Sequence, residues 1–467
     1  MKSIMLVCLN YYDDVFSHSK VKGAVSRGVT PLGLLCVAAP LVNSGHAVKI
    51  VDLNLANSPD DFLRSEINAF RPDIIGITAT TPLIYKAYRI ASLAKSADKR
   101  ILVVVGGPHA SALPEEVLSE SEIDCAVTGE GDFSLTALAD SGPHEGVPNI
   151  YFKKGDKIVA SDAQDRYVED LDSLPFPAYH LLEIEKYRQP RIASRKAPMG
   201  YFETSRGCYG RCIFCDKNIH GRRVRMKSPD KVVSEMERMI KLGFREIQII
   251  DDIFTADIKR AHDICEGILK KGLKFDWYPR GGIRVDRADR ELFALMKKAG
   301  CYRIPFGIES GSQRILDIID KRVTLGQAEE AVKFAKEAGM ETEAYFMIGN
   351  PTETEEDIKK SIDFAIKLDT DYAKFAVTIP FPGTALFDRM SERKQIKSRQ
   401  WDRYNFAVSP KELYEHDVLS WDIIDKYYDI SHREFYFRPL YIGKIFRKMV
   451  ADGTVFEHVG AFLKTRW

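Results

Sequence analysis

Three cysteines lie close together at positions 208, 212 and 215, in the segment TSRGCYGRCIFCD that runs from Thr204 to Asp216. Three thiolates on one loop can bind three irons of a four-iron cluster and leave the fourth iron open for a ligand that is not protein. The alternative is a zinc site, which needs a fourth protein ligand, and His220 is the nearby candidate. The CxxxCxxC spacing favours the open iron–sulfur cluster.

The cysteine loop directly follows a strand that opens a series of alternating strands and helices. Helical patterns separate six predicted strands, which are Tyr201–Thr204, Glu246–Ile250, Phe275–Pro279, Tyr302–Phe306, Ala344–Ile348 and Lys374–Thr378. Repeated β/α units of this kind close into barrels of parallel strands, and a full barrel has eight. The count therefore predicts a partial (β/α)6 barrel, with the cysteine loop at the end of its first strand.

A second α/β pattern precedes the barrel and predicts a doubly wound, Rossmann-like sheet. Its predicted strands are Ile4–Leu9, Val48–Asp52, Ile74–Thr78, Ile101–Val105 and Cys125–Thr128. Polar or glycine-rich turns follow these strands, and in an open α/β sheet the carboxyl ends of the strands face the ligand crevice. A polar ligand with a phosphate or amide periphery is expected there. No GxGxxG follows the first strand, so the pattern is not that of an NAD-binding domain.

The remaining segments suggest four regions along the chain. We expect an N-terminal domain over residues 1–145, a hairpin and Pro-punctuated connector over 146–195, the partial barrel over 196–385, and a small, mainly helical C-terminal domain over 386–467. Residues 422–450 read as helical. Tyr345, Phe381, Trp401 and Tyr404 are candidates for lining a substrate cavity, although ordinary core packing explains such aromatics equally well.

Composition excludes several classes of protein. The 467 residues are 45% hydrophobic and 29% charged, with a formal charge of +1, so no global charge favours nucleic acid or an acidic membrane. No apolar run reaches the roughly 18 residues that suggest a membrane span, and residues 1–10 do not form a secretory signal. Five of the eight cysteines are scattered through apolar segments, which suggests a reducing cytoplasm and not a disulfide framework.

The cysteine segment, with Phe214 before the third cysteine, resembles the radical S-adenosylmethionine (radical SAM) superfamily, whose fold is also a partial six-stranded barrel. The resemblance implies that the open iron chelates SAM and that reductive cleavage yields a 5′-deoxyadenosyl radical. It also implies SAM contacts at later strand ends, each of which has a solvated strand end or a helix cap as its alternative. These residues are Asp251 and Asp252 for the amino group, Arg284 for the carboxylate, Glu309 and Ser310 for the ribose, and Ile348 and Gly349 near the adenine. Asp251-Asp252 replaces the usual Gly-Gly-Glu, and the fifth-strand match is incomplete.

The N-terminal segments TPLGLL, DIIGITATT, VVVGGPHAS and VTGEGD resemble the cobalamin-binding domain of radical SAM proteins. The residues that this resemblance places at cobalamin are Thr78, Thr80, Gly106, Gly107, His109, Gly129 and Glu130. His109 either contacts the corrin periphery or caps the next helix. The DxHxxG pattern of cobalt-ligating histidines is absent, so Tyr11, Tyr12 or no residue is expected at the lower face of cobalt.

With both domains, the chain is similar to the cobalamin-dependent radical SAM class, which includes class B methyltransferases and the anaerobic magnesium-protoporphyrin ester cyclase. The resemblance implies a [4Fe-4S] cluster, SAM and cobalamin as cofactors, and methylation of an unactivated carbon. The alternatives are an oxidative cyclase or rearrangement enzyme with the same cofactors, or a non-catalytic corrinoid-binding sensor.

The expected partners are a small-molecule or lipid-like substrate and an electron donor such as flavodoxin or ferredoxin, without nucleic acid. Residues 433–467 carry seven basic and three acidic residues among apolar ones. They form either a solvated face or a weak contact with a membrane surface.

Overall fold

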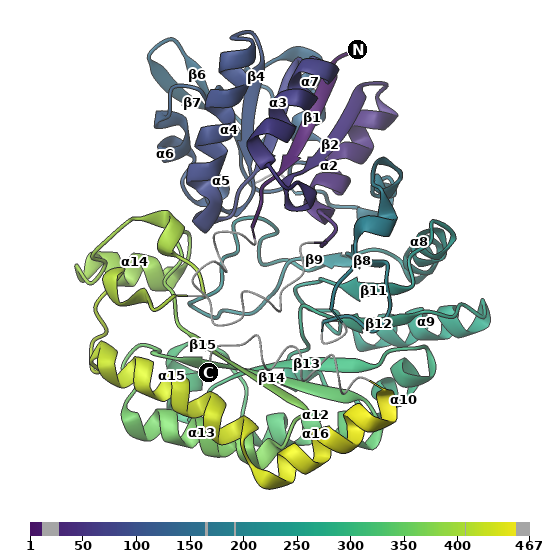
Figure 1. Cartoon of the computed structure of the whole chain (residues 1–467), viewed down its shortest axis with the longest axis vertical. Coiled ribbons are helices and arrows are strands. Elements are labelled where there is room, and N and C mark those ends of the chain that lie inside the picture. The colour runs from purple at the N-terminus through teal and green to yellow at the C-terminus, as the bar shows by residue number, and fades with distance from the viewer. Residues whose placement is uncertain (12–27, 164–166, 191–192, 407, 454–467) are drawn as a thin grey trace.

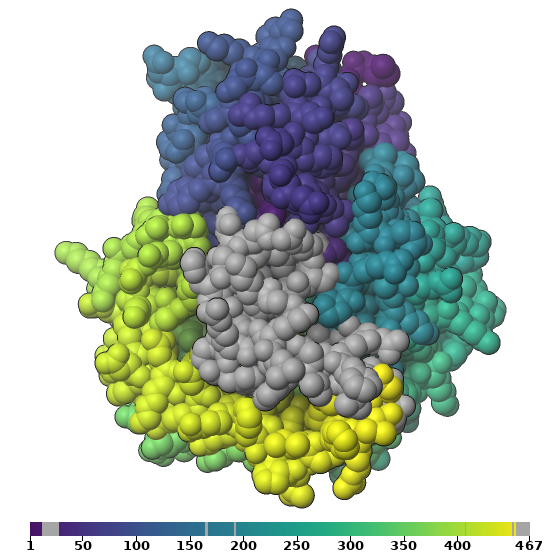
Figure 2. Space-filling view, in the orientation of Figure 1, coloured from purple at the N-terminus to yellow at the C-terminus, as the bar shows by residue number. Residues whose placement is uncertain are grey.

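The computed structural model describes residues 1–11, 28–163, 167–190, 193–406 and 408–453. An N-terminal α/β domain sits above a partial barrel, and two C-terminal helices run along the opposite side of the barrel (Figure 1). The space-filling view shows the same arrangement, with barrel segments on one side and the C-terminal segment on the other both reaching the N-terminal domain (Figure 2).

The N-terminal domain is built on a seven-stranded sheet in the order β2-β1-β3-β4-β5-β6-β7. Its strands are β1 (Ser3–Cys8), β2 (Ala47–Asp52), β3 (Ile74–Thr78), β4 (Leu102–Gly106), β5 (Cys125–Val127), β6 (Ile150–Lys154) and β7 (Lys157–Ala160). The first five strands pair in parallel, which confirms the doubly wound prediction. The strand order reverses between β1 and β3, and such a switch point opens a crevice at the carboxyl ends of the strands.

The hairpin of β6 and β7 belongs to this sheet, because β6 pairs with β5 in antiparallel fashion. We had expected the hairpin in the connector beyond residue 145. Its one apolar face explains the difference, since Ile150 and Phe152 are buried against the same core as β5. The boundary between the first domain and the connector otherwise stays a prediction.

Helices cover both faces of the N-terminal sheet. They are α2 (Leu32–Asn43), α3 (Pro59–Phe70), α4 (Ile84–Ala97), α5 (Pro108–Ala112), α6 (Pro114–Ser119) and α7 (Ser134–Ser141). Leu34 of α2 and Leu135 of α7 pack on one face, and Leu63 of α3 and Ile90 of α4 belong to the core on the other. Burial on both faces is why these strands are continuous runs of Val and Ile.

Six parallel strands form the partial barrel, as predicted. They are β8 (Met199–Phe202), β11 (Glu246–Ile249), β12 (Asp276–Pro279), β13 (Arg303–Glu309), β14 (Glu341–Ile348) and β15 (Tyr372–Val377). The first three and the last three each form a sheet, and two parallel bridges, Trp277 with Cys301 and Ile283 with Phe306, join the sheets between β12 and β13. A short antiparallel pair, β9 (Ser205–Arg206) and β10 (Arg225–Met226), stands outside this series.

The barrel helices pack outside the strands. They are α8 (Pro229–Lys241), α9 (Ile258–Lys270), α10 (Arg290–Lys298), α11 (Gln313–Ile318), α12 (Leu325–Glu337) and α13 (Glu355–Leu368). Side-chain caps fix where several of them begin, for example Ser228 before α8 and the Thr324–Gln327 capping box of α12.

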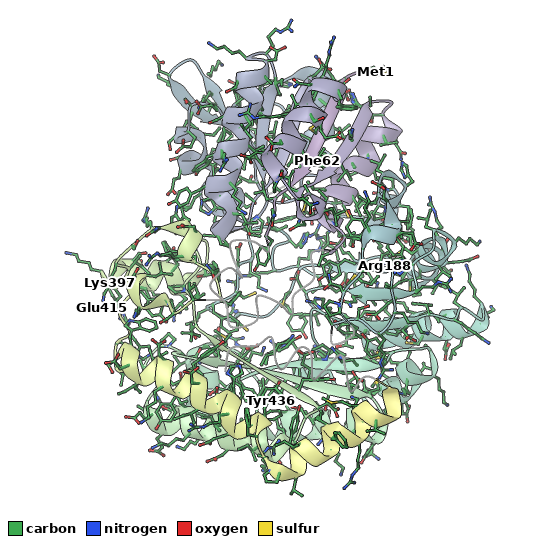
Figure 3. The ribbon with its side chains drawn as sticks, in the orientation of Figure 1. Met1, Phe62, Arg188, Lys397, Glu415 and Tyr436 are labelled. Carbon is green, nitrogen blue, oxygen red and sulfur yellow. The ribbon has the colours of Figure 1, made fainter. Side chains whose placement is uncertain are left out.

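The C-terminal region adds α14 (Ala385–Glu392), α15 (Trp421–Tyr436) and α16 (Pro439–Asp452). The helical character expected over residues 422–450 is confirmed, with a break at residues 437–438, because Pro439 lacks the N–H that a continuing helix requires and begins a new helix. Tyr436, labelled in Figure 3, ends α15. Its hydroxyl joins α15 to β15, donating to the Ala373 carbonyl at 2.7 Å and accepting from the Ala373 N–H at 3.1 Å. Within the described ranges, no helix has the length and apolar character of a membrane span.

A short turn of the C-terminal region reaches back to the N-terminal domain. The 3-10 helix Trp401–Arg403 packs against another at Thr81–Leu83. The Trp401 indole N–H donates to Glu116 of α6. Trp401 and Tyr404 are therefore buried at a contact between regions, which favours core packing over the alternative that they line a substrate cavity.

Candidate functional site

The loop that carries the three cysteines is fixed at its base by the β9–β10 ladder. At its start, buried Asp251 accepts from the Thr204 N–H at 2.6 Å and from the Ser205 hydroxyl at 2.7 Å. Arg260 of α9 donates to the Thr204 carbonyl at 2.8 Å. Asp251 therefore faces into the protein and anchors the cysteine loop, and the SAM contact expected of it is not supported.

Glycine is required where the loop turns after β9. Gly207 has a φ of 89°, and a Cβ there would lie 2.2 Å from the Arg223 carbonyl oxygen. Further along, a Cβ on Gly210 would lie 3.2 Å from the Cys208 Sγ and 4.0 Å from the Cys212 Sγ. Two of the thiols therefore converge on the open side of this glycine.

The thiols lie in a partly buried environment that contains cations. Burial raises the pKa values of Cys212 and Cys215, while Lys321 and Arg284 act against this at Cys212 and Lys217 acts against it at Cys215. All eight cysteines are free, including the three on this loop. Three free thiols with cations beside them suit an anionic iron–sulfur cluster held by thiolates.

The zinc alternative is not supported. His220 does not join the cysteines, because its Nδ1 lies 3.1 Å from Glu130 Oε1 and its Nε2 lies 3.8 Å from Glu203. Among the residues that the structure describes, no three His, Cys, Asp or Glu side chains gather closely enough to hold a single metal ion.

Three of the predicted SAM-binding residues lie around the cysteine loop. Asp252 accepts from the Gly207 N–H at 2.9 Å. Arg284 donates to the Lys321 carbonyl at 3.0 Å, and the Lys321 ammonium lies 2.8 Å from Glu309 Oε1. Asp252, Arg284 and Glu309 therefore remain our candidates for SAM contacts.

Other predicted SAM residues point away from this loop or only support it. Ser310 is buried, with its hydroxyl 3.1 Å from that of Ser361 on α13, and Ile348 is buried in the core. Phe214 packs against the same core. Gly349 has a φ of 79° and donates its N–H to Glu353 at 2.6 Å, so its role is to shape the turn after β14.

A cavity of about 520 Å³ opens between the N-terminal domain and the cysteine loop. Five of the seven residues expected at cobalamin line it, namely Thr78, Gly106, Gly107, Gly129 and Glu130. The cavity also extends beneath the sheet, between Leu6 and Val104 of the strands and Leu34 and Leu135 of the helices. The wall thus combines glycines and polar groups at the strand ends with apolar side chains beneath the sheet, which suits a large ligand with a polar periphery.

Glycines give this cavity its room. A Cβ on Gly33, in the first turn of α2, would meet no atom within 4 Å, so the missing side chain leaves open space at the cavity wall. Gly107 serves packing instead, because a Cβ there would lie 2.8 Å from the Thr78 hydroxyl. The residues present therefore fit cobalamin.

Two expected cobalamin contacts are absent from the cavity wall. Thr80 is exposed beyond β3, and His109 is fully buried. The His109 ring packs edge-on against Trp401 with centroids 5.3 Å apart, and burial lowers its pKa to about 4. His109 therefore packs between the two regions, outside the cavity wall, and its expected contact with the corrin stays a prediction.

Among the described residues that line the cavity, the N-terminal domain contributes no histidine and no tyrosine. Tyr11 lies outside the cavity wall, with its N–H donating to Asn54 at 2.9 Å, and Tyr12 lies outside the described residues.

Sequence reasoning missed a buried ionic network that joins the two domains along this cavity. Arg225 of β10 makes a bidentate pair with Glu130 at 2.7 and 2.9 Å, and Arg206 of β9 makes another with Asp132 at 2.8 and 3.0 Å. Burial opposes the charge on Glu130, but its bonds to His220 and Arg225 prevail and lower its pKa to about 2. The only signal in the sequence was the pair of acidic residues in the GEGD turn.

Comparisons with known proteins agree with this geometry. Residues 20–139 match the family model of the B12 binding domain, and residues 202–365 match that of the radical SAM superfamily. An uncharacterized methyltransferase of Pyrococcus horikoshii is 34% identical, over 96% of this chain and 95% of that protein. The anaerobic magnesium-protoporphyrin IX monomethyl ester cyclase of Rubrivivax gelatinosus is 30% identical, over 91% and 77%.

The fold also matches a solved structure. The cobalamin-dependent S-adenosylmethionine radical enzyme OxsB, with aqua-cobalamin bound, superposes with a TM-score of 0.77 and 18% identity, over 99% of this chain and 72% of that one. Because the two family models match the two domains that bound the cavity, the chain belongs to the cobalamin-dependent radical SAM enzymes.

Proposed function

We propose that the protein is a methyltransferase that adds a methyl group to an unactivated carbon of a small-molecule or lipid-like substrate. One observation carries this proposal: the cysteine loop itself forms part of the cobalamin cavity wall, through Asp216, Lys217 and His220. A methyl carrier in the cavity and a radical generator on the loop would therefore share one chamber.

The chain's own residues would divide the work as follows. Cys208, Cys212 and Cys215 would hold the cluster, and Arg284, with Glu309 and Asp252, would orient SAM beside it. The glycines and apolar side chains of the N-terminal cavity would hold cobalamin and exclude water. When bound, these cofactors supply a substrate radical and a transferable methyl group.

The test is an anaerobic reconstitution of the full chain with iron, sulfide and hydroxocobalamin, followed by reduction in the presence of SAM labelled in its methyl group. We expect about four irons and one cobalamin per chain, formation of 5′-deoxyadenosine, and transfer of label to the bound cobalamin. Loss of cobalamin on desalting would overturn the proposal.

The Cys208→Ala variant should lose 5′-deoxyadenosine formation and keep cobalamin. Cys265→Ala is the matched control, because Cys265 is buried in α9 and away from the loop. A Cys208→Ala protein that still cleaves SAM would contradict the assignment of the cluster ligands.

An oxidative cyclase is the second candidate, favoured by the 30% identity to the Rubrivivax gelatinosus cyclase. The same experiment separates the two, because a cyclase would cleave SAM without moving methyl label to cobalamin. A one-electron donor such as flavodoxin or ferredoxin and a reducing cytoplasm complete the proposal, in keeping with eight free cysteines.

The membrane-surface contact expected of residues 433–467 stays a prediction. In α16, Lys444 and Lys448 turn inward, with Lys448 2.9 Å from Glu341, while Ile442, Phe446 and Val450 are at least half exposed. Residues 454–467 lie outside the described part of the chain.

A further inference from the structure

The interior of the barrel is lined by one face of each strand. Tyr201, Gln248 and Tyr278 are register neighbours on β8, β11 and β12, so their side chains share a face. The alternate residues face the outer helices, as Trp277 does by donating to the Ala299 carbonyl at 2.9 Å and packing edge-on against Phe254. Tyr201, Gln248 and Tyr278 therefore face the barrel lumen, and Arg280 follows two residues after Tyr278 at the end of β12.

Other cations on the lumen faces of the strands are paired with carboxylates. Arg303 of β13 lies 2.9 Å from Glu341, and Lys374 of β15 lies 2.6 Å from Glu343. Pairing of this kind is what a partly buried charge normally requires.

Arg280 is the exception among the described residues of the lumen. It forms no ion pair with any described carboxylate, and both of its hydrogen bonds are made by Nη1 to neutral groups, at 3.2 Å to Gln248 Oε1 and 3.0 Å to the Tyr278 hydroxyl. Gln248 donates to the Ala193 carbonyl at 3.0 Å and the Tyr278 hydroxyl donates to it at 3.4 Å. Because the Gln248 amide and the Tyr278 hydroxyl both donate to the Ala193 carbonyl, their oxygens are left to accept from Arg280. These two bonds hold the guanidinium in place.

The opposite edge of the guanidinium is open. Neither Nε nor Nη2 of Arg280 bonds to a described residue. These two atoms are also not among the fully buried polar atoms that lack a partner. This edge of the guanidinium therefore reaches solvent inside the lumen. The Tyr201 ring lies below the guanidinium at 5.5 Å, and Tyr345 on β14 is only partly buried nearby. The Nε–Nη2 edge is a geometry with which arginine binds a carboxylate through two parallel hydrogen bonds.

We propose that Arg280 binds a carboxylate of the substrate in the barrel lumen, with tyrosine rings at its sides. The ligand is then a carboxylic acid. The identification of this acid as the substrate rests on the proposed methyltransferase function. The fixed Nη1 bonds lower the entropy that the side chain loses when the anion binds.

The experiment uses two small probes, benzoate and its neutral analogue benzamide, titrated into the reconstituted full chain and followed by ligand-observed NMR. We expect the protein to bind benzoate at least tenfold more tightly than benzamide. Arg280→Gln should weaken benzoate binding at least tenfold and leave benzamide unchanged, whereas Arg280→Lys should keep part of the preference because it keeps the charge.

Arg290→Gln is the matched control, because Arg290 pairs with Glu337 at 3.0 Å and is 58% exposed at the surface. Equal affinities for the two probes, or equal benzoate binding by the parent protein and Arg280→Gln, would overturn the proposal. So would a parallel loss of SAM affinity in Arg280→Gln, because the open edge would then hold the carboxylate of SAM. The binding assay needs no turnover. If methyl transfer fails while the protein still prefers benzoate to benzamide, the result counts against the methyltransferase proposal and not against the carboxylate site.

Discussion

At the scale of single residues, Lys321 is the cation most tightly built into the cluster site. Its side chain is 8% exposed and its ammonium lies 2.8 Å from Glu309 Oε1. Burial raises the pKa of Cys212, and the Lys321 charge acts against this rise. Gly307 makes room for this pair, since a Cβ there would lie 2.9 Å from the Lys321 Nζ and 2.7 Å from Glu309 Oε1. A fixed positive charge beside an anionic cluster favours its reduced form.

Lys321→Met should therefore lower the midpoint potential of the cluster. A loss of about 1.4 kcal/mol of stabilisation corresponds to roughly 60 mV for one electron, and we expect a shift of at least this size. A redox titration followed by EPR measures it. Lys321→Arg keeps the charge, and its cluster should have a midpoint potential near that of the parent protein. An unchanged potential in Lys321→Met would show that the Lys321 charge does not stabilise the reduced cluster.

The buried side chain of Glu353 should make the free energy of unfolding depend on pH. Burial raises its pKa to about 7, although the N–H groups of Gly349 and Asn350 donate to it. Between about pH 4.5 and 7 the unfolded chain releases this proton while the folded chain keeps it. The group's contribution to the free energy of unfolding therefore falls as pH rises, by on the order of 3 kcal/mol, and levels off above about pH 7.

Glu353→Gln removes the titrating group and keeps one oxygen acceptor. Urea midpoints of parent and variant, measured from pH 5 to 8, should diverge with rising pH in favour of the variant. Parallel curves would show that Glu353 does not carry the shift.

At the scale of elements, α2 supplies one wall of the cobalamin cavity. Gly33→Leu should project a side chain into that cavity without a clash, because a Cβ there meets no atom within 4 Å. We expect cobalamin retention after desalting to fall at least tenfold while the thermal midpoint stays within a few degrees of the parent. Gly443→Leu in α16 is the control, since a Cβ there also meets no atom within 4 Å and lies away from the cavity.

At the scale of the whole molecule, the cavity exists only while the two domains stay together. The Arg225–Glu130 and Arg206–Asp132 pairs join them, and removing one partner of a buried pair typically costs about 3–5 kcal/mol. Arg225→Met should therefore loosen the domains, speed proteolysis between them, and release cobalamin although every cavity-lining residue remains.

Arg223→Met is the matched control for this variant. Arg223 pairs with Glu169 at 2.7 Å, but the two side chains are 76% and 63% exposed, and such surface pairs contribute about 0–1 kcal/mol. Unchanged proteolysis and cobalamin retention in Arg225→Met would contradict a joining role for the network.

The sequence by itself determined the local features of this protein. The spacing of Cys208, Cys212 and Cys215, the Val- and Ile-rich strands and the glycine-rich turns are set by neighbours a few residues apart. The N-terminal sheet, the partial barrel and five of the seven residues expected at cobalamin were therefore predictable, whereas most of the cavity wall was not. The break before Pro439 was equally local, and its signal was in the sequence.

Only the tertiary structure decided which side chains reach the ligands. Asp251, Ser310 and His109 follow strands as the motifs require, but Thr204, Ser361 and Trp401, distant in sequence, enclose them. The Arg225–Glu130 pair and the open edge of Arg280 likewise depend on strands that meet only after folding. A motif specifies residue type and strand end, whereas burial and hydrogen-bond partners depend on packing between segments far apart in the chain.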